Sequence, residues 1–279
     1  MKKIWIIFLG ILAAVVVFPI LFLIVGSFMG KNELTGLIQP VLDTNARGYA
    51  SWKLIPEYPT LRSYVELLLD SLEFFVMFWN SVKLTGGILM GQFLVGVPAA
   101  WGFAKFEFPG RKFLFTVYIA MMMMPFQVMM LSNYLVLDSL SLLDTLSGII
   151  LPAIFSTFPV FIMYRFFAGI PEAVLGAARL DGAGELRLFF QIALPLGSPG
   201  IISAMVLGFL EYWNMIEQPM AFLKTKELWP LSLYLSNITM EKAGVSFAAS
   251  VIVLLPALLV FMAGQDYLEQ GIIASAMKE

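Results

Sequence analysis

The chain alternates between long apolar stretches and shorter polar segments. Apolar residues dominate from Ile4 to Phe28. Five further apolar stretches of similar length follow, at residues 82–103, 113–135, 146–167, 199–223 and 246–264. A helix needs about 20 apolar residues to cross the hydrocarbon core of a bilayer. The pattern therefore predicts an all-α, polytopic membrane protein with six transmembrane helices.

The first apolar stretch is open to two interpretations. Lys2 and Lys3 precede it, as basic residues precede both secretory signal peptides and first membrane helices. The stretch is longer than the 7–15 residues typical of a signal-peptide core, and no clear small-residue cleavage site follows it. We therefore predict an uncleaved first transmembrane helix within residues 1–30.

A long segment of mixed character, residues 31–80, separates the first two apolar stretches. Apolar side chains recur at helical spacing after Pro59: Leu61, Tyr64, Leu67, Leu68 and Leu72. This spacing predicts an amphipathic helix along the outer membrane surface. Trp79 marks an interface, where an amphipathic ring is stable. We expect residues 31–80 to form an extracytoplasmic loop with this interfacial helix.

Basic residues indicate the orientation of the six predicted spans. They gather in segments that the pattern places on one side: Lys2, Lys3, Arg111, Lys112, Arg179 and Arg187. The positive-inside rule then makes both termini cytoplasmic, with a core at residues 81–265 and a short tail at residues 266–279. Arg47, Lys53 and Arg62 in the long first loop depart from this bias, which is weak in long loops.

Two spans carry features that bear on packing. Gly86, Gly87, Gly91 and Gly96 in the second span offer the small faces that let membrane helices approach closely. The third span holds Pro125 and a run of four methionines at 121–124, which suits adaptable packing better than ligand binding.

Composition and charge exclude several classes of function. Of 279 residues, 60% are hydrophobic and 13% charged, against about 25% charged in soluble domains. The net charge of −2 gives no indication of nucleic-acid binding. The chain has no Cys and no His, which excludes disulfides, thiolate metal sites and Ser-His-Asp catalysis. It also lacks a phosphate-binding Gly-x4-Gly-Lys loop. We expect no enzyme activity, metal or cofactor, and any ATP must be bound by another chain.

The stretch Pro171–Pro195 is the longest in the second half that is not plainly membrane-spanning. It predicts two short helices that meet at Asp181–Gly182. Pro171 suits a first helical position, and Glu172 suits the first turn, where a carboxylate favours the helix dipole. Gly182 permits a left-handed corner, and Asp181 is placed to cap a second helix over 183–192. An interfacial amphipathic helix is the simpler alternative.

The fifth apolar stretch is the most polar one. Glu211, Asn214 and Gln218 follow i, i+3, i+7 spacing and would share one helix face. Ionisable groups at membrane depth usually face a cavity or a partner. Two interpretations stay open: a pore lining that binds a hydroxyl-rich solute, or an outer interface with a helix–helix bond through Asn214. Gln127 in the third span carries the same ambiguity.

The stretch 171–195 resembles the coupling loop, or EAA motif, of ABC-importer permeases. The family pattern is Glu-Ala-Ala, two residues, Asp-Gly-Ala and an Ile-x-Leu-Pro-like close. Here the motif's Glu is replaced by glycine. The residues that match its positions are Gly176, Ala177, Ala178, Asp181, Gly182, Ala183, Leu194 and Pro195.

Further motifs extend the resemblance to the MalG-type subunit of carbohydrate importers, over roughly residues 60–279. They are Met124–Gln127, Leu142–Thr145, Ile150–Pro152, and Trp213-Asn214 with Pro219. Departures include Ser132, where the family often has Pro, and Ser141, where a Gly is usual.

The resemblance implies a type I ABC importer permease fold with cytoplasmic coupling helices. It implies a permease subunit that forms half of a sugar or oligosaccharide pore and couples to a separate ATPase through the motif residues. The implied location is the plasma membrane. The implied partners are a second homologous permease, an ATP-binding-cassette ATPase dimer and an extracytoplasmic solute-binding protein. Two other classes remain alternatives. One is an ion-gradient-driven secondary transporter, a class that often has inverted repeats, whereas this sequence shows no convincing internal repeat. The other is a membrane scaffold.

Overall fold

The computed structural model describes residues 2–42, 49, 53–236 and 242–276. Within these ranges every regular element is a helix. The chain folds as two compact units. Unit 1 comprises residues 1–78 and 233–256, and unit 2 comprises residues 79–232 and 257–279.

The helices confirm the all-α, membrane-spanning class. Five helical stretches are long and apolar enough to cross a bilayer: Lys3–Ser27, Leu72–Lys105, Leu146–Ala168, Glu185–Trp213 and Ala243–Glu269. A sixth span exists only if a bent helix pair, Arg111–Met122 and Phe126–Ser139, is counted as one. The predicted number of six is therefore the upper value for the described residues.

Unit 1 contains α1 (Lys2–Ser27), α2 (Lys31–Leu42), α3 (Arg62–Val65), a π-helical turn (Glu66–Asp70) and the starts of α4 (Leu72–Lys105) and α14 (Ala243–Ala276). Its small core joins Met29, Leu34, Leu37 and Ala243. The predicted interfacial helix is shorter than expected, because extended backbone at Ser71 ends it. Arg47 lies outside the described residues.

Helix α4 begins at Leu72, ten residues before the predicted start of the second span. Residues 72–82 contain neither Gly nor Pro, so nothing in them ends a helix. Its 34 residues rise by about 51 Å, more than the roughly 30 Å of the hydrocarbon core. The helix therefore extends beyond the bilayer or tilts within it.

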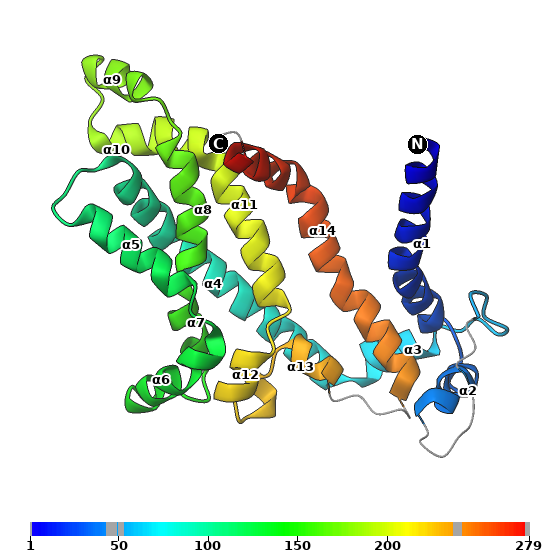
Figure 1. The fold of residues 1–279 in the computed structure, drawn as a ribbon. Coiled ribbons are helices and arrows are strands. Elements are labelled where there is room, and N and C mark those ends of the chain that lie inside the picture. The colour runs from blue at the N-terminus through cyan, green and yellow to red at the C-terminus, as the bar shows by residue number, and fades with distance from the viewer. Residues whose placement is uncertain (1, 43–48, 50–52, 237–241, 277–279) are drawn as a thin grey trace. The chain divides into compact units, whose positions relative to one another are not determined.

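The core of unit 2 lies where α4, α8 (Thr157–Ala168) and α11 (Leu194–Trp213) meet (Figure 1). Aromatic and aliphatic side chains fill it, among them Trp101, Met163 and Phe167. Neighbouring helices pack closely against the glycines of the second span, as predicted. Cβ atoms added at Gly91 and Gly96 would lie 2.3 Å from Ile154 and 3.2 Å from Met163. Gly86 is the exception and faces open space.

The predicted third span is not one helix. Helices α5 (Arg111–Met122) and α6 (Phe126–Ser139) meet at 103°. Pro125 causes the bend, since it lacks an N–H and disfavours helical backbone at the residue before it. The fourth span is interrupted between α7 (Leu146–Ile154) and α8, because Pro159 cannot donate to the carbonyl of Phe155, but the two helices still form one spanning stretch.

The fifth and sixth predicted spans also differ from expectation. Helix α11 ends at Trp213, ten residues before the predicted end at Leu223. Pro219 cannot donate to Met215, and Ser232 Oγ bonds that carbonyl instead, at 2.6 Å. Helix α14 continues through most of the predicted tail to Ala276, while residues 277–279 lie outside the described residues.

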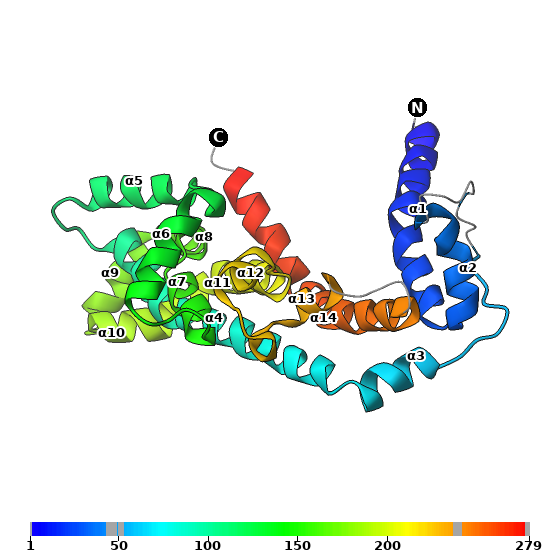
Figure 2. The ribbon, with the colours of Figure 1, turned by 90° about the horizontal axis from the view of Figure 1, so that it is seen from below.

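Unit 2 has two opposite ends (Figure 1). We call the end with α9 (Glu172–Leu180) and α10 (Glu185–Leu188) the α9 end. We call the other the α12 end. It consists of residues 138–145 and 214–232, which include α12 (Glu217–Phe222), a 3-10 turn (Lys226–Leu228) and the start of α13 (Leu231–Ser236). Helix α12 packs beside α6 and α7 (Figures 1 and 2).

Candidate functional site

The strongest candidate site is the corner between α9 and α10. Gly182 has φ +83, the left-handed conformation that its sequence position predicts. Its N–H donates to the Arg179 carbonyl at 3.0 Å, and the Ala183 N–H donates to the Ala178 carbonyl at 3.0 Å. These two bonds form a Schellman motif, in which a left-handed residue satisfies the last carbonyls of a helix. The corner is thus built into the local backbone.

Two details of this stretch correct the sequence prediction. Asp181 is not the N-cap of the second helix. It is the C-cap of α9, and α10 begins at Glu185 after Gly184. Asp181 is the last residue before the left-handed Gly182, and its N–H donates to the Ala177 carbonyl of α9. It therefore belongs to the end of the first helix and not to the start of the second.

The second helix also does not end near residue 192, where the prediction ended it. A π-helical turn (Phe189–Ala193) carries the chain from α10 straight into α11. Pro195 has no N–H to donate within this continuous helix, and the π-helical turn directly before it is the local irregularity that accompanies the missing bond. The Pro195 carbonyl, which Pro199 cannot bond, accepts from Ser198 Oγ at 2.8 Å instead.

Two leucines anchor the corner to the core of unit 2. Leu175 on α9 and Leu188 on α10 are fully buried in the cluster that contains Trp101 and Phe167. Burying a Leu side chain stabilises a fold by about 1.5–3 kcal/mol. Both α9 and α10 are therefore packed against α4 and α8, the helices that form the core of unit 2.

A charged network holds the two helices at their angle. Arg179 Nη1 bonds Glu172 Oε1 at 2.9 Å within α9, and Arg179 Nε bonds Glu185 Oε1 at 2.9 Å across the corner. The hydrogen bond from Arg179 holds the pKa of Glu172 below its usual value, and the bonds to Glu185 and Glu172 raise the pKa of Arg179. Arg179 thus links both sides of Gly182 as a fixed cation.

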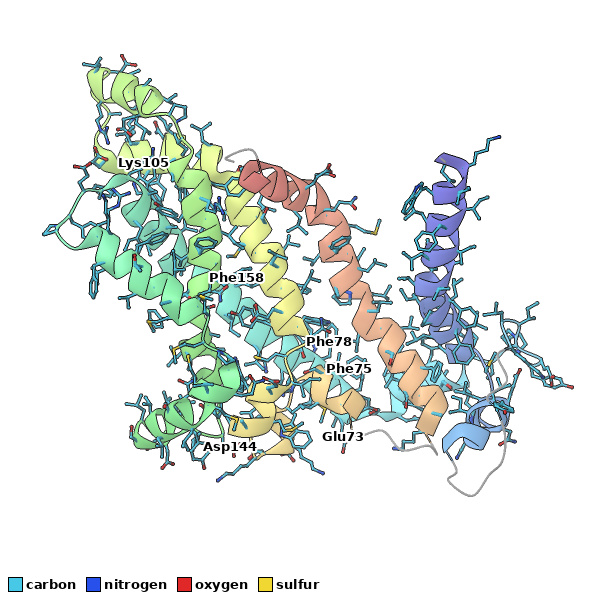
Figure 3. The ribbon with its side chains drawn as sticks, viewed as in Figure 1. Glu73, Phe75, Phe78, Lys105, Asp144 and Phe158 are labelled. Atoms are coloured by element: carbon cyan, nitrogen blue, oxygen red, sulfur yellow. The ribbon has the colours of Figure 1, made fainter. Side chains whose placement is uncertain are left out.

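Lys105 connects this network to the last turn of α4 (Figure 3). Its Nζ donates to the Ile170 carbonyl at 2.6 Å and lies 3.6 Å from Glu172 Oε2. Its side chain is 10% exposed, so the cation is largely withdrawn from solvent.

The corner exposes two large apolar side chains on its outer surface. Leu180 and Leu186, on either side of Gly182, are 91% and 76% exposed. Ala177 is exposed, whereas Ala178 and Ala183 pack in part against the core cluster. The alanines that match the motif are therefore divided between an inner and an outer face. The geometry suits docking of another protein rather than chemistry.

Gly176 lies in open surroundings on α9, with no heavy atom within 4 Å of an added Cβ. The carboxylate that the motif places there is absent. Glu172, one turn earlier, is engaged by Arg179 and Lys105. It is therefore not free to take over the role of that carboxylate.

The polar residues of the fifth apolar stretch do not share a helix face. Glu211 lies exposed in the last turn of α11, and Asn214 is the residue that ends this helix. Asn214 Nδ2 donates to the Leu210 carbonyl at 2.9 Å, which caps its own helix. Gln218 lies in α12, beyond the break, so the predicted face is wrong.

Gln127 at the start of α6 instead meets a residue of α12. Its Nε2 lies 2.9 and 3.1 Å from the two carboxylate oxygens of Glu217. This bond joins the α6 and α12 segments at the α12 end. Within the described ranges, no group of acidic side chains is arranged to hold a metal ion.

Sequence reasoning missed three parts of the candidate site. Glu172 and Arg179 are two turns apart with opposite charge, so their pairing was available from spacing. The bond from Arg179 to Glu185 depends on the corner. The contact of Lys105 joins positions 65 residues apart and left no signal in the sequence.

Comparison with known proteins gives consistent matches. The family model described as "Binding-protein-dependent transport system inner membrane component" matches residues 92–274, about two-thirds of the chain. The arabinooligosaccharides transport system permease protein AraQ of Halalkalibacterium halodurans is 27% identical, covering 98% of this chain and 96% of AraQ. The diacetylchitobiose uptake system permease protein NgcG of Streptomyces coelicolor is 29% identical, covering 89% of this chain and 80% of NgcG.

A solved structure shows the same fold. It is a chain of a bacterial ABC transporter involved in the import of the acidic polysaccharide alginate, with a TM-score of 0.80. The identity is 22%, and 95% of each chain is covered.

Proposed function

Because the chain belongs to the family of inner membrane components of binding-protein-dependent transport systems, we propose that it forms half of a membrane pathway for a sugar or oligosaccharide. As a member of this family it is a multi-pass transport subunit, and ATP hydrolysis resides on a separate subunit. The saccharides in the names of AraQ and NgcG support the solute class. The observation that carries the proposal is the exposed, rigidly anchored corner between α9 and α10.

The corner is our proposed contact with the ATPase. Leu180 and Leu186 offer apolar side chains to a cleft, and Ala177 lets the partner approach the α9 backbone. Gly182 sets the angle between the two helices. Leu175 and Leu188 pass a displacement of the corner to α4 and α8, because they are buried against both. Asp181 is the C-cap of α9. Ala183 donates its N–H to the last turn of α9 and packs against the core cluster.

The orientation follows from charge. Basic residues flank the α9 end: Lys105, Arg111, Lys112, Arg179 and Arg187. We propose that this end is cytoplasmic and that both termini are cytoplasmic as well. The 20 residues of α11 rise by about 30 Å, the thickness of the hydrocarbon core. The α12 end would then face the solute-binding protein.

The second permease subunit has a specific place in this proposal. Gly176 leaves this chain without the carboxylate of the family motif, and Glu172 is engaged within its own helix. We propose that the partner permease supplies that carboxylate in its own corner. The ATPase dimer would then receive one corner with the acid and one without it.

The solute pathway is proposed to include Glu211. This carboxylate is exposed in the last turn of an apolar helix, where an ionisable group is stable only beside water or a partner. Glu211→Leu should lower uptake while the complex still assembles. Asn214→Leu is the comparison, since it removes a helix cap and should lower thermal stability instead.

The proposal is tested by purifying the tagged chain from its own membranes and identifying the subunits that remain bound. We expect an ATPase, a second permease and, with solute, a binding protein. Reconstituted vesicles should take up labelled arabino- or chito-oligosaccharides only with ATP on the side of the α9 end. Uptake by the chain alone, driven by an ion gradient, would identify a secondary transporter and overturn the proposal.

A further inference from the structure

Asp144 ties together two segments of the α12 end that are 80 residues apart in the sequence (Figure 3). Its Oδ1 accepts the backbone N–H groups of Lys224 and Thr225, each at 2.8 Å. Its Oδ2 accepts Thr225 Oγ1 at 2.5 Å. The Asp144 N–H donates back to the Phe222 carbonyl at 2.9 Å. One residue thus makes four hydrogen bonds to residues 222–225.

The backbone on both sides of Asp144 is fixed in advance. Asp144 has φ +57, a left-handed conformation that Asp and Asn tolerate better than most residues. Thr145, the next residue, caps α7 by accepting the Gly148 N–H at 3.1 Å. A Cβ at Gly148 would lie 2.3 Å from the Leu142 carbonyl, so this turn is closely packed. The carboxylate is therefore held in place before it meets its partners.

Apart from Asp144, the segment is held by its flanks and by the 3-10 turn that follows it, in which the carbonyls of Thr225 and Lys226 accept the N–H groups of Leu228 and Trp229, each at 3.1 Å. Leu223 is buried, and Asn80 Nδ2 donates to the Glu227 carbonyl at 2.7 Å. Between these points Lys224, Thr225 and Lys226 are exposed. An exposed, charged segment of this kind would sample many conformations without a clamp. The hydrogen bonds that the Asp144 carboxylate accepts select one of them.

We propose that Asp144 is a positioning residue that holds residues 222–226 in the shape on which the solute-binding protein docks. The inference rests on the proposed function, which makes the α12 end the extracytoplasmic face. The exposed side chains of this end, Met220, Lys224 and Lys226, offer the apolar and charged groups of a docking surface. A surface held in its bound shape loses less conformational entropy when the partner docks.

Glycine and asparagine variants separate the clamp from the turn. Asp144→Gly relaxes the left-handed backbone and removes the carboxylate, so it would be harmless if Asp144 only formed the turn. Asp144→Asn keeps the shape and loses the charge. Asp138→Asn is the matched control, because Asp138 lies in α6 near the same loop, is exposed and makes no side-chain hydrogen bond to any residue that the structure describes.

The assay measures ATP hydrolysis by the reconstituted complex as the concentration of solute-loaded binding protein is raised. For Asp144→Gly we expect roughly a ten-fold higher half-maximal concentration, as when two or three hydrogen bonds no longer order a segment. Hydrolysis without binding protein should stay within about two-fold of wild type, since the α9 end is untouched. Asp144→Asn should shift the curve less, and Asp138→Asn should not shift it.

An unshifted curve for Asp144→Gly, with wild type responsive, would overturn this inference and leave the proposed function intact. A wild-type complex that ignores the binding protein would overturn both. If Asp144→Gly does not assemble, Thr225→Val decides the matter, because it removes only the Oγ1 hydrogen bond. A shift of at least two-fold in that variant supports the clamp, and no shift overturns it.

Discussion

Replacing Gly182 with valine tests the proposed coupling corner most directly. Gly182 has φ +83, and an added Cβ would have no heavy atom within 4 Å. A larger side chain therefore meets no steric obstacle, and the whole effect comes from the backbone. A β-branched residue is a genuine outlier at positive φ.

The expected cost follows from this geometry. A non-glycine residue held in a sparsely populated backbone region costs about 1–3 kcal/mol, which lowers the population of the bent corner by roughly 5- to 150-fold. If the corner straightens, the Schellman bonds of Gly182 and Ala183 are lost, and Arg179 separates from Glu185. Membrane insertion should be normal, because Gly182 lies outside every apolar stretch.

The assay compares ATPase retention and solute uptake per ATP in purified, reconstituted complexes. Gly184→Ala is the matched control, since this neighbouring glycine has φ −73 and equally open surroundings. Gly182→Asn should lie between the control and Gly182→Val, because Asn tolerates the left-handed region. If Gly182→Val behaves like Gly184→Ala in both measurements, the corner does not couple to an ATPase.

Three further predictions concern other parts of unit 2. Arg179→Met should weaken coupling modestly, because each exposed ion pair contributes about 0.2–1 kcal/mol, while Arg187→Met, which does not bridge the corner, should leave uptake per ATP unchanged. Ser141 has φ +55, so Ser141→Gly should raise the melting temperature of the purified chain by relieving about 1 kcal/mol of strain, and a lower melting temperature would contradict this. The hydrogen bonds from Thr225 lower the pKa of Asp144, so its stabilising effect is complete above the ordinary Asp pKa and is lost as pH falls through the lowered value. The difference in melting temperature between wild type and Asp144→Asn should thus be constant from about pH 5 to 8 and shrink below about pH 4, and a change between pH 6 and 8 would refute the assignment.

Much of the fold was available from the sequence because it depends on local properties. A chain in lipid must satisfy its backbone hydrogen bonds internally, and about 20 apolar residues cross the bilayer as a helix, so most apolar stretches predict a span without reference to their neighbours. The left-handed corner at Gly182 is local as well, since only the residue itself decides whether positive φ is tolerated. The class, the approximate spans and the corner could therefore be predicted one window at a time.

The tertiary structure decided where spans break and which polar groups meet. Just beyond the end of α11 at Trp213, the Met215 carbonyl accepts its hydrogen bond from Ser232, a partner that no local window contains. Lys105 reaches Ile170, and Asp144 reaches Thr225, only after the intervening helices have packed. A hydrogen bond requires its two atoms to lie within about 3 Å, and for segments 65–80 residues apart that distance is set by packing rather than by sequence spacing.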